Sequence, residues 1–146
     1  MTAVVVQARL GSSRLPGKAL LPLGGLPLVY RVLEALKTVK ADAYALACPP
    51  ECAAAFSESA EQNGFCVVTG PEDDVLARYC NAVRALGIDR VVRATADNPF
   101  VFADAANALL AEGFDADYAA YSGLPYGAGV ESVAAEALLR AEREAV

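Results

Sequence analysis

The 146-residue chain carries 12 Lys and Arg against 18 Asp and Glu, a net charge of −6, and contains no histidine. This acidic balance argues against a broad nucleic-acid-binding face, which neutralises many phosphates with Lys and Arg, whereas a small anionic ligand needs only a local basic pocket. Without histidine, Ser-His-Asp and Cys-His nucleophile systems are excluded, and any chemistry must rest on carboxylates, Lys and Arg, backbone amides or an oxygen-bound metal.

Five short apolar runs predict the strands of an α/β fold. They are residues 2–8, 43–47, 65–68, 90–95 and 117–120. Such runs are typical of strands that are buried on both faces of a parallel sheet. Because helical segments separate them, we expect right-handed crossovers and a Rossmann-like, doubly wound, mostly parallel sheet. Ligands of such sheets bind beyond the carboxyl ends of the strands.

Helical spacing of apolar residues predicts the connecting helices. The segments are residues 28–36, a weaker 51–62, 73–86, 103–112 and 131–146. Pro27 stands where a first helical residue tolerates proline, and Gly87 and Gly113 are expected to end the third and fourth helices. The last pattern stops without a capping signal, which fits either a C-terminally truncated chain or a terminal helix that ends at Val146.

The length of 146 residues indicates a single domain, residues 1–146, while cysteine spacing and hydropathy indicate a cytoplasmic protein. The four cysteines form no Cys-x-x-Cys pair, which argues against a sulfur-bound metal, and each is expected to be a small buried core residue. No apolar run reaches the roughly 18 residues of a membrane span, and no basic leader precedes the first apolar run.

A basic loop follows the first strand in the segment 8–18, ARLGSSRLPGK. It supplies two glycines, two hydroxyls and three cations: Gly11, Gly17, Ser12, Ser13, Arg9, Arg14 and Lys18. Glycine lets the backbone approach a phosphate, the hydroxyls donate hydrogen bonds, and the cations balance anionic charge. The loop is not a Walker A motif, since five rather than four residues separate Gly11 from Gly17 and Ala19 lacks the magnesium-binding hydroxyl. A triphosphate is therefore the expected ligand, with an exposed basic turn as the alternative.

Acidic residues at two other places favour a ligand or metal site. Asp97 closely follows the 90–95 run, so its carboxylate is expected where open α/β sheets bind their ligands. Asp115 and Asp117 imitate the Asp-x-Asp metal motif of nucleotide-sugar glycosyltransferases, and solvated surface carboxylates are the alternative.

Three further features have two interpretations each. The acidic run 72–74 either caps the third helix or touches a ribose or a metal-bound water. Arg78 either reaches a nucleotide or lies on the surface. The Gly-rich segment 121–129 is either a mobile loop over a sugar site or a plain connection.

The segment 8–36, ARLGSSRLPGKALLPLGGLPLVYRVLEAL, closely resembles the opening of the CMP-sugar synthetases. Later segments agree in order and spacing: TGPEDDVL at 69–76, RATADNPF at 93–100 and GVE at 129–131. The resemblance covers nearly the whole chain. It extends to CMP-KDO synthetases, acylneuraminate cytidylyltransferases and especially the spore coat polysaccharide biosynthesis type, and it implies a fold of the nucleotide-diphospho-sugar transferase type.

This resemblance implies a cytidylyltransferase that joins CTP to an acidic sugar, releases pyrophosphate and serves surface polysaccharide biosynthesis. The nucleotide-binding residues that it implies are Ala8, Arg9, Leu10, Gly11, Ser12, Ser13, Arg14 and Lys18. Backbone near Ala8 and Leu10 would hold the cytosine, and Asp97 would bind Mg²⁺. Lys18, Arg9 and Asp97 would act in catalysis. The partners implied are CTP, a sugar-acid acceptor and a second copy of the chain in a homodimer.

Two other functions stay open at this point. The first is a truncated or degenerate module that binds a nucleotide without turnover, which would bind CTP but release no pyrophosphate. The second is a metal-dependent nucleotide-sugar glycosyltransferase that uses Asp115 and Asp117. Its activity would be lost when that pair, rather than Asp97, is changed.

Overall fold

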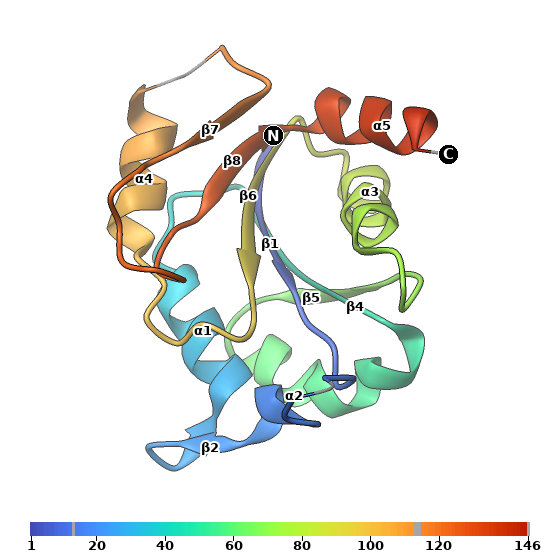
Figure 1. Cartoon of the computed structure of the whole chain (residues 1–146), viewed down its shortest axis with the longest axis vertical. Helices are drawn as coiled ribbons and strands as arrows, with labels where there is room; N and C mark the ends of the chain where they lie inside the picture. Colours follow the sequence, from blue (N-terminus) through green and yellow to red (C-terminus); the bar gives the residue numbers. More distant parts are fainter. Residues whose placement is uncertain (13, 113–114, 146) are drawn as a thin grey trace.

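The computed structural model describes residues 1–12, 14–112 and 115–145. Within them lies a six-stranded sheet in the order β5-β4-β1-β6-β8-β7 (Figure 1). The strands are β1 Thr2–Gln7, β4 Ala43–Cys48, β5 Cys66–Thr69, β6 Arg90–Thr95, β7 Tyr118–Ala120 and β8 Glu131–Ala134. β1, β4, β5 and β6 run parallel, and β8 is antiparallel to both of its neighbours. The expected Rossmann-like, mostly parallel α/β sheet is confirmed.

Helices cover both faces of the sheet (Figure 1). One face carries α1 Leu28–Leu36, α2 Ala53–Gln62 and α4 Ala103–Glu112, and the other carries α3 Val75–Leu86 and α5 Ala135–Glu144. Because strand side chains alternate between faces, Val4 and Val6 of β1 pack into the first layer and Ala3 and Val5 into the second. β1 is therefore buried on both sides, and a rigid strand holds the loop that follows it.

Two short helical turns and a hairpin complete the description. The 3-10 helices are η1 Lys18–Leu20 and η2 Pro50–Cys52, and the hairpin pairs β2 Pro22–Leu23 with β3 Leu26–Pro27. Pro27 is the residue before α1 rather than its first residue, a correction of one position. Its φ of −54° and ψ of 144° are extended, as its pairing in the hairpin requires.

The helix α3 has a polar start and a glycine stop. The Asp74 side chain accepts a hydrogen bond from the Ala77 backbone N–H at 2.9 Å, and Gly87 closes the helix with φ at 63°. The capping role expected for the acidic run 72–74 therefore belongs to Asp74. The glycine expected to end α4, Gly113, lies outside the described residues.

Changing Asp74 to alanine is expected to lower the free energy of unfolding by about 1 kcal/mol, because an N–H of the first turn loses its acceptor. Urea denaturation followed by circular dichroism measures this difference. Asp73→Ala is the matched control, since Asp73 is an adjacent exposed carboxylate that is not the N-cap. An equal loss in both variants would assign the effect to charge at the helix N-terminus instead of capping.

The helix predicted for residues 131–146 is wrong in its first four residues. Glu131–Ala134 form β8 between β6 and β7, and α5 begins only at Ala135. Ser132 is buried, and its hydroxyl accepts a hydrogen bond from the Arg90 guanidinium at 3.1 Å. A four-residue strand that leads straight into a helix is too short to be distinguished from that helix by apolar spacing. Its conformation is decided by pairing in the sheet.

The two edge strands are less buried than predicted. β7 is antiparallel to β8 and exposes Tyr118 and Ala120, whereas the sequence predicted a strand buried in a parallel sheet. β5, at the opposite edge, exposes Cys66 and Thr69. An edge strand has a strand neighbour on one side only, and a short apolar run does not reveal that position.

The cysteines divide into three buried residues and one exposed residue. Cys48, Cys52 and Cys80 are buried as expected, but Cys66 is exposed on β5, and all four thiols are free. Burial raises the pKa of the Cys48 thiol to about 11, which makes it a poor nucleophile at neutral pH. In the described part of the chain, no helix is long and apolar enough to cross a membrane.

Candidate functional site

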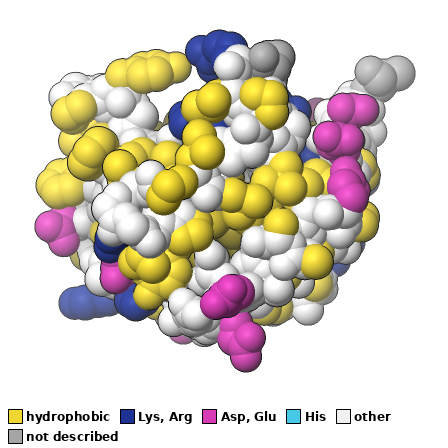
Figure 2. Space-filling view, turned by 90° about the horizontal axis from the view of Figure 1, so that it is seen from below, with side chains coloured by type: hydrophobic (Ala, Val, Ile, Leu, Met, Phe, Trp, Pro, Cys, Tyr) yellow, Lys and Arg dark blue, Asp and Glu magenta, His cyan; other side chains and the backbone are white. Residues whose placement is uncertain are grey.

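The parallel strands β1 and β6 end side by side, with Gln7 opposite Thr95. A pocket of about 210 Å³ opens at this edge of the sheet. Its walls are formed by Gln7, Ala8, Arg9, Gly11, Ser12, Arg14, Lys18, Ala19, Thr95, Ala96 and Asp97. Figure 2 views the molecule from this end and shows hydrophobic side chains across the middle of the face, with charged side chains nearer its rim. The pocket lies where open α/β sheets bind ligands.

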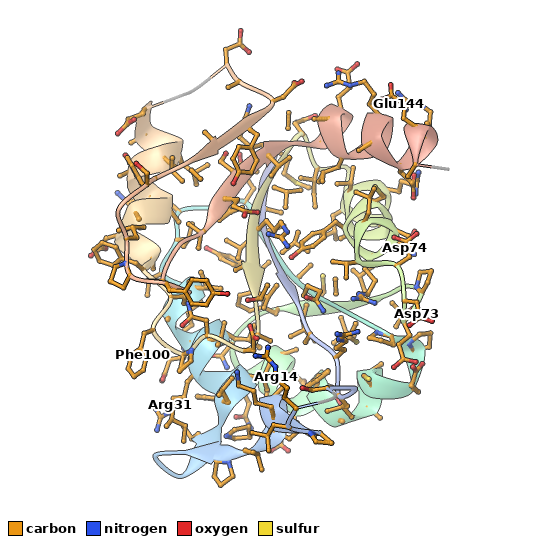
Figure 3. The ribbon with its side chains drawn as sticks, in the orientation of Figure 1. Arg14, Arg31, Asp73, Asp74, Phe100 and Glu144 are labelled. Atoms are coloured by element: carbon orange, nitrogen blue, oxygen red, sulfur yellow. The ribbon has the colours of Figure 1, made fainter. Side chains whose placement is uncertain are left out.

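The basic loop after β1 is closed by its own hydrogen bonds. The Gly17 N–H donates to the Leu10 carbonyl at 3.0 Å, and the Leu15 N–H donates to the Ser12 hydroxyl at 3.3 Å. Gly17 has φ at 69°, in the left-handed region that favours glycine, and the chain turns there into η1. This turn brings Lys18 to the pocket wall. Arg14 lies near the same end of β6 in Figure 3.

Lys18 and Asp97 face each other across the pocket. The Lys18 Nζ atom is 3.8 Å from Asp97 Oδ2, while the Thr95 hydroxyl donates to Asp97 Oδ1 at 2.8 Å. A separation of 3.8 Å is too long for a hydrogen bond, so this ion pair leaves the ammonium donors of Lys18 available to a ligand. Asp97 keeps 64% of its side chain exposed, and Thr95 fixes its orientation. The Lys18 ammonium and the Asp97 carboxylate can therefore both contact a ligand bound in this pocket.

Most of the predicted binding residues come together at this pocket. Its lining includes Ala8, Arg9, Gly11, Ser12, Arg14, Lys18 and Asp97. Leu10 does not line the pocket, and its carbonyl instead closes the loop. Ser13 lies outside the described residues.

Four lining residues were missed by the sequence analysis: Gln7, Ala19, Thr95 and Ala96, of which Gln7 and Thr95 are polar. Gln7 is the polar last residue of an apolar strand, and Thr95 ends β6 in the same way. The sequence did contain a signal for Gln7 and Thr95, because polar residues at the carboxyl ends of neighbouring parallel strands meet where such sheets bind ligands. Which strands are neighbours is set by the sheet order, which the sequence left undetermined.

The residues of the pocket fit a magnesium ion that is held partly by phosphate oxygens. Mg²⁺ prefers octahedral oxygen ligands and usually combines one or two carboxylates with substrate phosphates and water. Asp97 supplies one such carboxylate at the pocket. The described residues contain no group of three or more acidic, cysteine or histidine side chains placed to hold a metal by themselves. This donor set therefore fits an ion that a polyphosphate helps to bind.

The pair Asp115 and Asp117 lies at the other end of the strands from the pocket. The Asp117 carbonyl accepts a hydrogen bond from Ala134 N–H, and Ala134 is opposite Arg90, the first residue of β6. Asp97 follows the other end of β6, roughly 20 Å away along the strand. Asp117 instead pairs with Arg140 on α5. The structure thus does not bring the Asp-x-Asp pair to the pocket.

Two features that had two interpretations are now placed. Arg78 is fully buried, so the surface position is wrong. The segment 121–129 lies beside the strand end that carries Asp97, because the Phe102 N–H donates to the Ala128 carbonyl at 2.9 Å and Gly127 lies against Asn98. This segment is therefore next to the candidate site.

Curated proteins that are similar in sequence include the following two. The spore coat polysaccharide biosynthesis protein SpsF of Bacillus subtilis is 33% identical over 147 residues, which cover 95% of this chain and 61% of that protein. A 3-deoxy-manno-octulosonate cytidylyltransferase of an Anaeromyxobacter species is 33% identical over 111 residues, 74% of this chain and 45% of that enzyme. The chain thus spans less than two thirds of the length of these relatives.

Solved structures share the fold. A cytidylyltransferase of Leptospira borgpetersenii matches with a TM-score of 0.88 at 26% identity, over 97% of this chain and 63% of that one. A CMP:2-keto-3-deoxy-manno-octonic acid synthetase, solved in complex with CTP, matches with a TM-score of 0.78 at 18% identity, over 97% and 77%. The sequence model of the family described as "Cytidylyltransferase" matches residues 3–145. The chain belongs to the cytidylyltransferase family.

Proposed function

We propose that this chain carries the CTP-binding core of an enzyme that transfers CMP from CTP to an acidic sugar. The observation that carries this proposal is the Lys18–Asp97 pair, 3.8 Å apart at the adjoining ends of β1 and β6, in the pocket that the basic loop lines. Family membership supports CTP as the nucleotide, since the loop by itself suits any nucleoside triphosphate. The names of the SpsF protein and the octulosonate cytidylyltransferase support a sugar acid and surface polysaccharide assembly.

The proposed reaction is an in-line displacement at the α-phosphorus. A sugar hydroxyl oxygen forms the new bond to phosphorus and releases its proton to water, the bond between the α-phosphorus and the bridging oxygen breaks, and pyrophosphate leaves. Such reactions depend on positioning and on stabilising negative charge, so the missing histidine is no obstacle. Lys18, Arg9 and Arg14 would neutralise the phosphates, and the hydroxyl of Ser12 and the backbone at Gly11 would orient them.

Asp97 is proposed to hold Mg²⁺ together with the phosphate oxygens of CTP. The bound ion would supply positive charge where phosphate charge builds. Thr95 would keep the Asp97 carboxylate turned toward the pocket by donating its hydroxyl to Oδ1. The homodimer and the cytoplasmic location stay predictions.

Isothermal titration with CTP, UTP, ATP and GTP, each with Mg²⁺, tests the nucleotide site. Selective binding of CTP is the expected result. A second measurement of pyrophosphate release with CTP and 3-deoxy-manno-octulosonate, the sugar acid named in a relative, tests turnover. If the chain binds CTP but releases no pyrophosphate in the presence of any sugar acid, the result would favour the nucleotide-binding module. A chain that binds none of the four nucleotides would contradict the proposal.

A further inference from the structure

We propose that Glu72 reads the cytosine base, with Arg78 holding it in place, so that this pair selects CTP over UTP. The proposal rests on the function proposed above and adds a side chain that distinguishes one base from another. It starts from a buried arginine that the phosphate site does not use. Arg78 is fully buried, and its Nε and Nη2 atoms have no hydrogen-bond partner in the described structure.

The contacts of Arg78 converge on the segment that carries Glu72. Its Nη1 atom donates to the backbone carbonyls of Pro71 and Glu72. Gly70 lies so close that an added Cβ would be 3.0 Å from Arg78 Cγ. Among the described residues, no carboxylate forms an ion pair with Arg78, and its side-chain hydrogen bonds go to this backbone. A buried cation is costly without compensation, and here its donors fix the loop that begins α3.

The Glu72 side chain reaches from this loop to the phosphate loop. Its Oε1 atom is 3.0 Å from where a Cβ on Gly11 would lie, and Gly11 lines the pocket. Glu72 is exposed, and the described residues give its carboxylate neither an ion pair nor a hydrogen-bond donor. Its neighbour Asp74 is occupied by the helix cap, and Asp73 and Asp74 lie beside α3 in Figure 3. Glu72 is thus a free acceptor at the rim of the nucleotide pocket.

The direction of the nucleoside follows from what occupies the two ends of the pocket. Lys18 and Asp97 mark the phosphate end, between β1 and β6. Beyond Asp97, Asn98 lies against Gly127, and we assign this side, next to the segment 121–129, to the acceptor sugar. The other side begins at Ala8, whose N–H donates to the Ala47 carbonyl of β4 at 3.0 Å, and it leads toward Glu72. A base that extends this way meets an unpaired carboxylate.

A carboxylate at this place favours cytosine over uracil for a simple reason. Cytosine carries an amino donor at position 4, where uracil carries a carbonyl oxygen, and an ionised carboxylate can only accept hydrogen bonds. Glu72 would accept from the amino group of CTP and would repel the carbonyl oxygen of UTP. Because both nucleotides have the same triphosphate, the general repulsion between Glu72 and the phosphates cancels in the ratio of their affinities.

The test is the ratio of CTP to UTP affinity, measured by titration calorimetry with Mg²⁺ on the full chain. Glu72→Gln supplies an amide donor that can pair with uracil, so the ratio is expected to fall by about 10-fold or more. Asp73→Asn is the matched control, since it removes an equal charge from the adjacent exposed residue and should change both affinities alike. Arg78→Lys should also lower the ratio, because one ammonium cannot reproduce the guanidinium contacts.

The outcomes separate the two proposals. An unchanged ratio in Glu72→Gln, or a wild-type chain that binds CTP and UTP equally, overturns base reading by Glu72 while leaving the nucleotide site intact. An equal fall in Asp73→Asn also overturns it, since the effect would then come from charge alone. A wild-type chain that binds neither nucleotide overturns the proposed function itself, and this inference with it.

Discussion

Replacing Lys18 with alanine is expected to lower kcat for CMP-sugar formation by about 100- to 1,000-fold, the range seen when one preorganised charge donor to a transition state is removed. The ammonium lies 3.8 Å from Asp97 and keeps its donors free, so it can follow the charge that moves onto the leaving pyrophosphate. Pyrophosphate release under saturating CTP measures the effect, because saturation separates turnover from binding.

Two variants make this result specific. Lys40→Ala removes an equal charge from an exposed residue at the other end of the strands, beside Asp42 and Thr2. This variant should leave kcat unchanged. Lys18→Arg keeps the charge but changes its shape, and should recover part of the rate. A Lys18→Ala enzyme that keeps its kcat within about threefold of wild type would show that Lys18 is not at the reacting phosphate.

Changing Asp97 to asparagine is expected to reduce the gain in CTP affinity that magnesium provides and to lower turnover by about 100-fold or more. Asparagine has nearly the same shape and still accepts the Thr95 hydrogen bond, so the variant removes charge with little change in geometry. Without Mg²⁺, the variant should bind CTP more tightly than wild type, because a carboxylate no longer repels the triphosphate. With Mg²⁺ it should bind CTP more weakly, because the ion loses its protein ligand.

Titration of both proteins with CTP, with and without Mg²⁺, measures this crossover. Asp115→Asn is the control, since Asp115 is an exposed carboxylate near the start of β7, away from the pocket. If Asp115→Asn or Asp117→Asn abolishes turnover while Asp97→Asn does not, the glycosyltransferase alternative regains support. If magnesium still strengthens CTP binding to Asp97→Asn as it does in wild type, Asp97 is not its ligand.

The effects of changing Lys18 and Asp97 are expected to be coupled. Lys18 and Asp97 carry opposite charges 3.8 Å apart, so each partly compensates the charge of the other. Removing one leaves the other unpaired, so the effects of Lys18→Ala and Asp97→Asn on CTP affinity should not add. The double variant measures this coupling directly. Additive effects would mean that the two side chains act on separate parts of the ligand.

The sequence by itself determined the class of fold, most of the elements and the loop that carries the charge. Buried apolar runs and helical spacing are local properties, so β1, β6, α1 and α4 were predicted with nearly the observed bounds. The glycines and cations of residues 9–18 stand in one continuous segment, which is why this candidate site could be proposed without coordinates. Asp97 was proposed as a site residue because the residues that follow a parallel strand lie where such sheets bind ligands.

Only the tertiary structure decided the features that depend on neighbours distant in sequence. Strand pairing made Glu131–Ala134 a strand rather than a helical turn, and sheet order put Gln7 beside Thr95. Residues 72 and 78 belong to an acidic, partly helical segment with ordinary local spacing, so nothing in the sequence shows that Arg78 is buried or that Glu72 touches Gly11. Burial and contact across more than 60 residues arise when helices and loops pack on the sheet, and local pattern does not encode them.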